Sequence, residues 1–207
     1  MDSVKYWNSV FSKLRYIKPE YDLWLEKYKD ILSLSHDFPI VDLGCGDGGN
    51  SLYLNNNGYQ VISCDFSEEA LNIVKLFIPK CIRLKFDFAK DFPFDDDSVK
   101  CIIADLSIHY FNKVVTMNII DNMQRSLVNG GFLICRLDSN KNLCSDNINI
   151  EIEENFYKID GIYKSFFNKE YIYKIFRKWN LIFCEEKKIY KYSKEKIIWE
   201  VVAKVKK

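Results

Sequence analysis

The chain has 207 residues, 48% of them hydrophobic and 15% aromatic, with a formal net charge of +1 at pH 7. This composition is typical of one globular domain with a full core and excludes a disordered chain. A charge so close to zero argues against nucleic acid as the main partner, because phosphate binding depends on a strongly basic face.

Targeting and redox signals favour a cytoplasmic protein. No apolar run reaches the roughly 20 residues that span a bilayer, and the first residues, MDSVKYWNSV, lack the apolar core of a signal peptide. Seven cysteines, an odd number without a C-x-x-C pair, indicate a reducing compartment. The two histidines, His36 and His109, lie far apart in the sequence, so we expect no metal site. Because no apolar run is long enough to span a bilayer, we also expect no membrane partner.

The first 34 residues are expected to be helical. Apolar and aromatic side chains recur there at helical spacing after Pro19, a residue favoured in the first turn of a helix. Tyr6 and Trp7 precede this stretch. Core packing is one explanation of the aromatic side chains; the other is that Tyr6 or Trp7 closes over a ligand as part of an N-terminal lid.

From residue 38 onward, apolar strands alternate with helices. Strands are predicted at 38–43, 59–64, 81–86, 99–106 and 132–137. The helices between them cover 51–57, the stretch from the N-cap Ser67 to Pro79, and 114–128, with Gly130 and Gly131 stopping the last. The alternation predicts an α/β fold: a Rossmann-like doubly wound sheet of about seven strands, mostly parallel with an antiparallel C-terminal strand, plus N-terminal helices.

The last third has a different pattern. Asp160 and Gly161 fit a two-residue hairpin turn between aromatic-rich arms. A helix is expected at 169–179, followed by an antiparallel pair of strands at 181–190 and 197–205. The lysines between residues 187 and 196 are interpreted as a solvated surface.

The most informative stretch is residues 40–50, IVDLGCGDGGN. A strand that runs into a glycine-rich turn and then a helix presents free N–H groups to a nucleotide. Gly44-x-Gly46-x-x-Gly49 matches the dinucleotide fingerprint, and Asp65 follows at the distance expected of a ribose partner. Asp42 lies inside the apolar strand, where a carboxylate needs a partner, and we interpret it as a sign of a cationic ligand.

Four predicted strands carry an aspartate at or near their ends: Asp42, Asp65, Asp87 and Asp105. The carboxyl ends of parallel strands meet at one edge of a sheet, where ligands bind. Asp42 and Asp47 would repel a pyrophosphate, whereas Asp87 suits the exocyclic amine of adenine. S-adenosylmethionine has a sulfonium, an ammonium and no phosphate, so it fits this acidic edge better than a nicotinamide cofactor.

These motifs resemble those of class I S-adenosylmethionine-dependent methyltransferases. The resemblance rests on VDLGCGDGGN, VISCDFS, FDFAKDFPF, DDDSVKCIIADLSIHYF and SLVNGGFLICR, within residues 38–138, and more loosely on KIIWEVVAK. The strand-four segment and the small size resemble small-molecule methyltransferases of the tellurite-resistance type. The tetrapeptide of amino-methylating DNA and protein-glutamine enzymes, (Asn/Asp)-Pro-Pro-(Tyr/Phe), is replaced by Asp105-Leu106-Ser107-Ile108.

The resemblance implies one domain with an N-terminal lid (1–36), a cofactor-binding core (37–138) and an acceptor-side segment (139–207). Its cofactor site would consist of Asp42, Gly44, Cys45, Gly46, Asp65, Phe66, Asp87, Phe88, Asp105 and Ser107. Asp42 would help to hold the ammonium group, Asp65 the ribose hydroxyls and Asp87 the adenine amine. Cys45 is explained better as a small residue between glycines than as a nucleophile.

Acceptor-side residues are assigned from their places after the strands. His109 is the candidate general base, with packing of its loop as the alternative. Tyr6, Trp7, Tyr110, Arg136, Glu153 and Tyr157 are expected to line the acceptor pocket. Arg136 could hold an acceptor carboxylate or oxyanion, or form a surface salt bridge.

The expected function is in-line methyl transfer from S-adenosylmethionine to a small molecule, with S-adenosylhomocysteine as product. The alternatives are a protein or RNA methyltransferase, a non-catalytic S-adenosylmethionine-binding protein and an NAD-dependent oxidoreductase. A monomer or a homodimer is expected.

Overall fold

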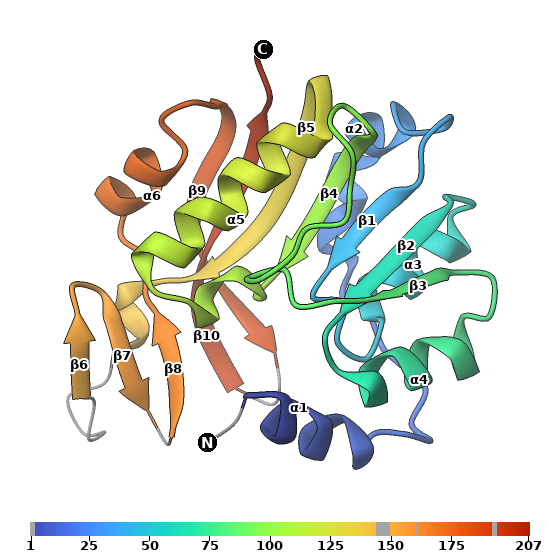
Figure 1. The fold of residues 1–207 in the computed structure, drawn as a ribbon, viewed down its shortest axis with the longest axis horizontal. Helices are drawn as coiled ribbons and strands as arrows, with labels where there is room; N and C mark the ends of the chain where they lie inside the picture. The colour runs from blue at the N-terminus through green and yellow to red at the C-terminus, as the bar shows by residue number, and fades with distance from the viewer. Residues whose placement is uncertain (1–2, 144–149, 160, 192–193) are drawn as a thin grey trace.

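One seven-stranded sheet dominates the computed structural model, which describes residues 3–143, 150–159, 161–191 and 194–207 (Figure 1). The strands follow the order β3-β2-β1-β4-β5-β10-β9. Their bounds are β1 Ile40–Leu43, β2 Val61–Asp65, β3 Ile82–Lys85, β4 Val99–Asp105, β5 Leu127–Asp138, β9 Asn180–Lys191 and β10 Lys194–Lys204. Strand β10 pairs antiparallel with both β5 and β9, and the other strand pairs of this sheet are parallel. The predicted fold is confirmed.

Helices cover both faces of this sheet and create two hydrophobic cores. The helical segments of the described residues are α1 Ser3–Ser12, η1 Leu23–Tyr28, α2 Lys29–Ser33, α3 Gly49–Asn56, α4 Glu68–Phe77, η2 Ile108–Tyr110, α5 Lys113–Ser126, η3 Asn140–Asn142 and α6 Lys169–Ile175. Helices α5 and α6 pack into one core, and η1, α2, α3 and α4 into the other. Alternate β4 residues enter opposite cores: Ile102 and Ala104 one, Cys101 and Ile103 the other. A sheet buried on both faces needs such continuous apolar strands.

Two local predictions are corrected. In place of the helices expected over residues 1–34, the described residues 3–34 form three short helical pieces, and the second begins at Leu23 instead of Pro19. Helix α5 ends at Ser126, so Gly130 and Gly131 do not stop it but lie inside β5. A Cβ on Gly131 would lie 2.9 Å from the Val128 carbonyl oxygen, which shows that these glycines permit a tight bend within the strand.

A second, three-stranded sheet stands beside the main one (Figure 1). It contains β6 Ile150–Glu153, β7 Phe156–Ile159 and β8 Ile162–Ser165. Strands β7 and β8 form the predicted hairpin with Ile159 opposite Ile162, although its turn residue Asp160 lies outside the described residues. Strand β6 was not predicted.

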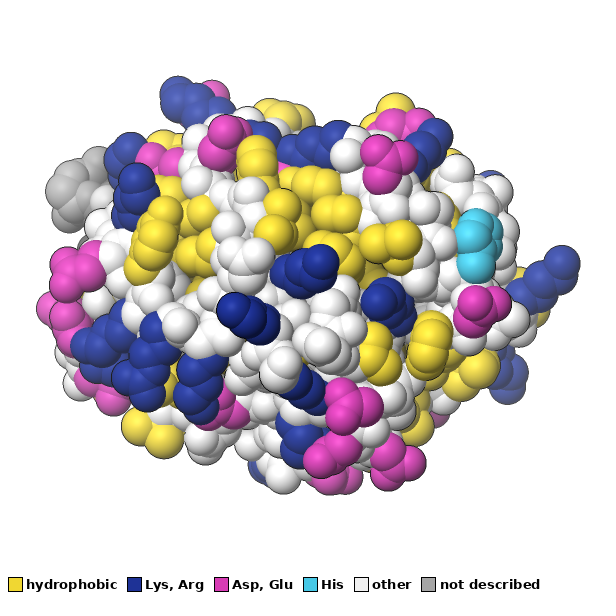
Figure 2. Space-filling model, turned by 90° about the horizontal axis from the view of Figure 1, so that it is seen from above, with side chains coloured by type: hydrophobic (Ala, Val, Ile, Leu, Met, Phe, Trp, Pro, Cys, Tyr) yellow, Lys and Arg dark blue, Asp and Glu magenta, His cyan; other side chains and the backbone are white. Residues whose placement is uncertain are grey.

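The carboxyl ends of the parallel strands point to the lower edge in Figure 1, where α1 lies. The opposite face, seen in Figure 2, mixes lysines and arginines with acidic and apolar side chains. Among the described residues, no helix is both long and apolar enough to cross a membrane.

Candidate active site

The glycine-rich loop after β1 packs directly against the end of β4. Gly44, Gly46 and Gly48 have φ of +72°, +56° and +92°, a region that favours glycine. A Cβ on Gly44 would lie 2.4 Å from Cβ of Ser107, and the Ser107 hydroxyl donates to the Leu43 carbonyl at 2.7 Å. Close approach of the two strand ends therefore requires glycine at position 44.

Asp65, at the end of β2, faces this loop. One carboxylate oxygen accepts the Gly46 N–H at 3.0 Å and the other accepts the Ser67 N–H at 2.9 Å. Burial raises the pKa of Asp65 to about 6. Each carboxylate oxygen has a further lone pair, so Asp65 has the acceptors that the two hydroxyls of a ribose need.

The loop after β3 contributes Asp87 and Phe88. The Asp87 carboxylate accepts the Ala89 N–H at 3.1 Å and forms an ion pair with Lys90 at 2.8 Å. The Phe88 ring is buried and approaches to 3.6 Å from the position that a Gly44 Cβ would occupy. Phe66 is half-buried beside Asp65 in sequence. The predicted adenine side therefore borders the glycine loop.

Cys45 lies inside the glycine loop with a buried side chain. Burial raises the pKa of its thiol well above the usual value, and nearby carboxylates add to this effect. A thiol held in its neutral form is a poor nucleophile, which agrees with the interpretation of Cys45 as a small residue.

Asp42 has a partner within the protein. It is 1% exposed and accepts the Ser51 hydroxyl at 2.6 Å, while Ser51 also contacts the Ser63 hydroxyl at 2.7 Å. Burial raises the pKa of Asp42 to about 7. A cationic ligand is therefore not needed to explain this buried carboxylate, and that part of the sequence interpretation is corrected.

Asp47 occupies the beginning of α3. Its carboxylate accepts the Gly49 N–H at 3.3 Å, at the helix end where a bound pyrophosphate would otherwise take N–H groups. The place that the dinucleotide fingerprint reserves for phosphate therefore holds a carboxylate.

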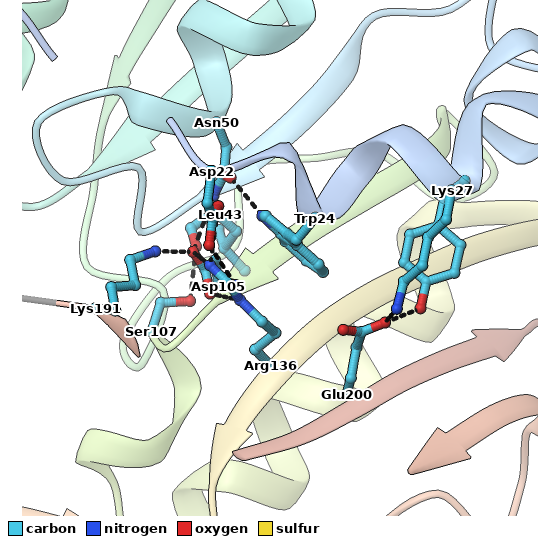
Figure 3. Close-up of polar contacts among 11 residues, drawn as sticks. Asp22, Trp24, Lys27, Leu43, Asn50, Asp105, Ser107, Arg136, Lys191 and Glu200 are labelled. Carbon is cyan, nitrogen blue, oxygen red and sulfur yellow. Dashed lines mark hydrogen bonds and ion pairs between the residues drawn. The ribbon is translucent and has the colours of Figure 1, made fainter. Parts of the chain in front are cut away.

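Asp105, at the end of β4, is the centre of a charged network (Figure 3). It accepts from Nε and Nη2 of Arg136 at 2.6 and 2.7 Å, from Lys191 at 2.5 Å and from Asn50 at 3.4 Å. Burial would raise the pKa of Asp105, but Arg136 and Lys191 outweigh it and hold that pKa well below its usual range. Leu106, the next residue, has φ of +52°, which is unusual for a bulky side chain.

Of the two alternatives for Arg136, the salt bridge is present, but it is buried and does not lie at the surface. The Arg136 side chain is 1% exposed, and Nη1 donates to Asp22 at 2.7 Å. The guanidinium lies 4.3 Å from the ring centre of Trp24, whose indole N–H donates to Asn50 at 2.9 Å. Because the guanidinium N–H groups of Arg136 donate to Asp105 and Asp22, few donors remain to bind an acceptor oxyanion.

The interpretation of the lysines between residues 187 and 196 as a solvated surface holds for Lys188 and Lys194, which are exposed, but not for Lys191 and Lys196. Lys191 is 21% exposed and pairs with Asp105, and Lys196 is only partly exposed. Sequence analysis did not identify the residues that contact Asp105 and Arg136, because these contacts join distant parts of the chain. These residues are Lys191, Asn50, Asp22 and Trp24.

Helix α1 lies across the glycine loop. The Trp7 ring stacks on Phe11 with centroids 5.7 Å apart and meets Tyr110 edge-on at 5.2 Å. Phe11 lies 3.4 Å from the position of a Gly46 Cβ. The Ser67 hydroxyl donates to Asn8 at 2.6 Å. Of the predicted acceptor residues, the structure thus brings Tyr6, Trp7 and Tyr110 together, since Tyr6 also contacts Trp7.

His109 is fully buried, and neither ring nitrogen has a hydrogen-bond partner among the described residues. Burial lowers its pKa to about 3, so the imidazole is neutral.

Glu153 and Tyr157 lie on the small sheet. Glu153 accepts the Lys113 N–H at 3.1 Å at the start of α5, and the Tyr157 hydroxyl donates to Glu151 at 3.2 Å. Both of these side chains have structural contacts.

Within the described part of the chain, no group of three or more histidine, cysteine, aspartate or glutamate side chains is arranged to hold a metal ion.

Comparison with known proteins identifies the same region. Residues 40–131 match a family described as methyltransferase domain. The chain is 28% identical over 100 residues to an uncharacterised methyltransferase of Synechocystis sp., covering 48% of this chain and 47% of that protein. It is 32% identical over 103 residues to a demethylmenaquinone methyltransferase of Clavibacter sepedonicus, covering 48% and 41%. The matched part spans less than half of either relative's length.

A solved structure extends the likeness of fold to nearly the whole chain. An S-adenosylmethionine-dependent methyltransferase of Methanosarcina mazei superposes with a TM-score of 0.77 at 17% identity, covering 90% of this chain and 99% of the other. The residues of the site suit a nucleoside without a phosphate, because Asp65 offers acceptors for a ribose and the Asp47 carboxylate accepts the Gly49 N–H at the start of α3. Residues 40–131 thus match a methyltransferase domain, and nearly the whole chain shares the fold of an S-adenosylmethionine-dependent methyltransferase, which indicates S-adenosylmethionine as the cofactor to test.

Proposed function

We propose that the chain transfers a methyl group from S-adenosylmethionine to a small-molecule acceptor. The observation that carries this proposal is the position of Asp65, whose carboxylate is bonded to Gly46 of the glycine loop and keeps lone pairs for two ribose hydroxyls. The match of residues 40–131 to a methyltransferase domain supports the same reaction. When bound, the cofactor supplies an activated methyl group on a sulfonium.

The cofactor would lie along the carboxyl edge of β1 to β4. Asp65 would accept the ribose hydroxyls, and Phe66 would border the adenine. Asp87 would accept the adenine amine, and the Phe88 N–H would donate to a ring nitrogen. The backbone of Gly44, Cys45 and Gly46 and that of Asp105 to Ser107 would border the methionine part.

Helix α1 would serve as the lid of the site. No side chain of α1 is fully buried, and an isolated helix of this length is marginal in water, so its detachment would disturb little of the core. In the closed position Trp7, Phe11 and Tyr110 exclude water from the loop. Exclusion of water prevents side reactions of the activated methyl group. The in-line displacement itself requires the nucleophile to be held about 3 Å from the methyl carbon.

A lid that covers the site favours a small acceptor over a protein or an RNA. Asp65 is only 5% exposed beneath α1. The Clavibacter relative is named a demethylmenaquinone methyltransferase, so phenols and quinols form a reasonable first set of acceptors to test. His109 would take the proton of such an acceptor only if the acceptor reaches this buried imidazole.

Calorimetry with S-adenosylmethionine and S-adenosylhomocysteine tests the cofactor part of the proposal. Asp65→Ala should weaken binding tenfold or more, whereas Asp121→Ala, which alters an exposed pair with Lys178, should not. Unchanged affinity in Asp65→Ala would refute the ribose role.

Transfer of labelled methyl to a panel of small molecules tests catalysis. Binding of the cofactor without any labelled product would favour a non-catalytic binding protein. A fluorescence titration with NADH should show no saturable binding, and tight binding would favour an oxidoreductase.

A further inference from the structure

Four elements converge beyond the carboxyl end of β5. Asp138 ends β5, Lys164 comes from β8 of the small sheet, Lys196 from β10 and His109 from η2. We call these four residues the Asp138 cluster. The side chains of Asp138 and Lys164 form an ion pair and are 2% and 19% exposed, and His109 is fully buried. The cluster is therefore an interior polar group with cationic side chains near the surface.

Positive charge is concentrated around one carboxylate. Burial would raise the pKa of Asp138, but the charges of Lys164 and Lys196 oppose burial, and that pKa lies below its usual range. Burial lowers the pKa of Lys196 to about 8; Asp138 opposes this effect, and repulsion from Lys164, Lys194 and Lys191 adds to it. An oxyanion placed beside Lys164 and Lys196 would relieve the repulsion between these two side chains.

His109 provides a second, independent observation. Neither Nδ1 nor Nε2 has a hydrogen-bond partner among the described residues, although the ring is completely buried. Buried polar atoms without partners are rare in native proteins and frequently mark a functional site. A neutral imidazole has one donor and one acceptor nitrogen, so it can bind a hydroxyl or amine group.

The position of the cluster suits the acceptor side of the proposed reaction. Ser107, which precedes η2, packs against Gly44, and Tyr110, the last residue of η2, contacts Trp7, so both border His109 in the chain. The small sheet is joined to the end of η2, because the Ser165 hydroxyl donates to the Phe111 carbonyl at 2.6 Å. The cluster thus continues the carboxyl edge from β4 to β5 and β10.

We propose that the Asp138 cluster recognises the methyl acceptor as an oxyanion. The acceptor carries a carboxylate, sulfate or phosphate group that binds Lys164 and Lys196, and a neighbouring hydroxyl or amine that hydrogen-bonds to His109. This assignment rests on the proposed methyltransferase function and specifies the class of acceptor. The donors of Arg136 are bound to Asp105 and Asp22, so Arg136 is not the residue that would bind the oxyanion.

Anion binding to the full chain, saturated with S-adenosylhomocysteine, tests the proposal. The probes are sulfate, inorganic phosphate and benzoate, each titrated against chloride at equal ionic strength by calorimetry. At least one probe should bind with one site per chain, and Lys196→Met should weaken it tenfold or more. The matched control is Lys188→Met, which alters an exposed ion pair with Glu195 on the same hairpin and should leave anion binding unchanged.

The structural alternative is that the charges only hold the small sheet in place. In that case Lys196→Met would lower the unfolding midpoint without changing anion affinity, and the proposal would be overturned. Absence of one-site binding by all three probes, or equal losses in Lys188→Met, would also overturn it. If S-adenosylhomocysteine itself fails to bind, the methyltransferase function fails; if it binds and the anions do not, only the acceptor assignment fails.

Discussion

Arg136 on β5 donates to both carboxylate oxygens of Asp105 on β4, through Nε at 2.6 Å and Nη2 at 2.7 Å (Figure 3). The two residues are paired in the register of the parallel strands. Nη1 extends the contact to Asp22, which ties the N-terminal segment to the edge of the sheet. The pair therefore joins the segment that leads from α1 to the strand ends that form the site.

Arg136→Met should destabilise the protein strongly, because it leaves the buried Asp105 carboxylate without its main partner. Breaking a buried ion pair typically costs about 3–5 kcal/mol. The control is Arg125→Met, which breaks a partly exposed pair with Asp96 and should cost about 1 kcal/mol or less. Urea unfolding measures both, and equal losses would contradict the importance assigned to the buried pair.

Gly44→Ala should be far more damaging than Gly58→Ala. Both glycines have positive φ, but a Cβ at position 44 would lie 2.4 Å from Ser107, whereas nothing lies within 4 Å of one at position 58. We expect Gly58→Ala to cost about 1–2 kcal/mol for its backbone conformation alone. Thermal unfolding and cofactor titration of the two variants make the comparison, and a tolerated Gly44→Ala would show that the two strand ends are not closely packed.

Cofactor affinity should depend on pH through Asp65. Ribose hydroxyls need the ionised carboxylate as acceptor, and the pKa of Asp65 is raised to about 6 by burial. The dissociation constant should therefore rise about tenfold for each pH unit below 6 and level off above it. Calorimetry from pH 5 to 8 measures this dependence. Asp65→Asn should bind weakly at every pH, and a wild-type curve that is equally flat would argue against the assignment.

The free energy of unfolding of the ligand-free protein should depend on pH through Asp42. Its folded pKa of about 7 lies above the unfolded value, so the native state binds more protons between about pH 4 and 7. This contribution to the free energy of unfolding is present at low pH and is lost as pH rises through 7. His109, with its lowered pKa, acts in the opposite direction over part of this range. The difference between wild type and Asp42→Asn should isolate the effect, and a pH-independent difference would refute it.

Phe11→Ala should speed cofactor release with little loss of global stability. Phe11 contacts the region over Gly46, yet α1 contributes no fully buried side chain. Stopped-flow fluorescence should show faster dissociation than in wild type. Tyr16→Ala is the control, because this side chain of the same segment is 79% exposed. Equal dissociation rates in all three proteins would show that α1 is not the lid.

The sequence was sufficient to predict the strands and the glycine loop because their signals are local. Asp65 could be predicted from the end of its strand and its spacing from the glycines. The partners of Asp105 could not, because the Arg136–Asp22 contact joins residues 114 positions apart. Lys191 was interpreted as solvated from its charged neighbours, and only the length of the β9–β10 hairpin brings it to Asp105.

A crystal structure with S-adenosylhomocysteine bound is the most direct test of the central claim, that the carboxyl edge beside Asp65 holds the cofactor. The account predicts the ribose hydroxyls on the Asp65 carboxylate, with the adenine beside Asp87 and Phe88. A nucleoside bound elsewhere, or one whose ribose makes no contact with Asp65, would contradict it.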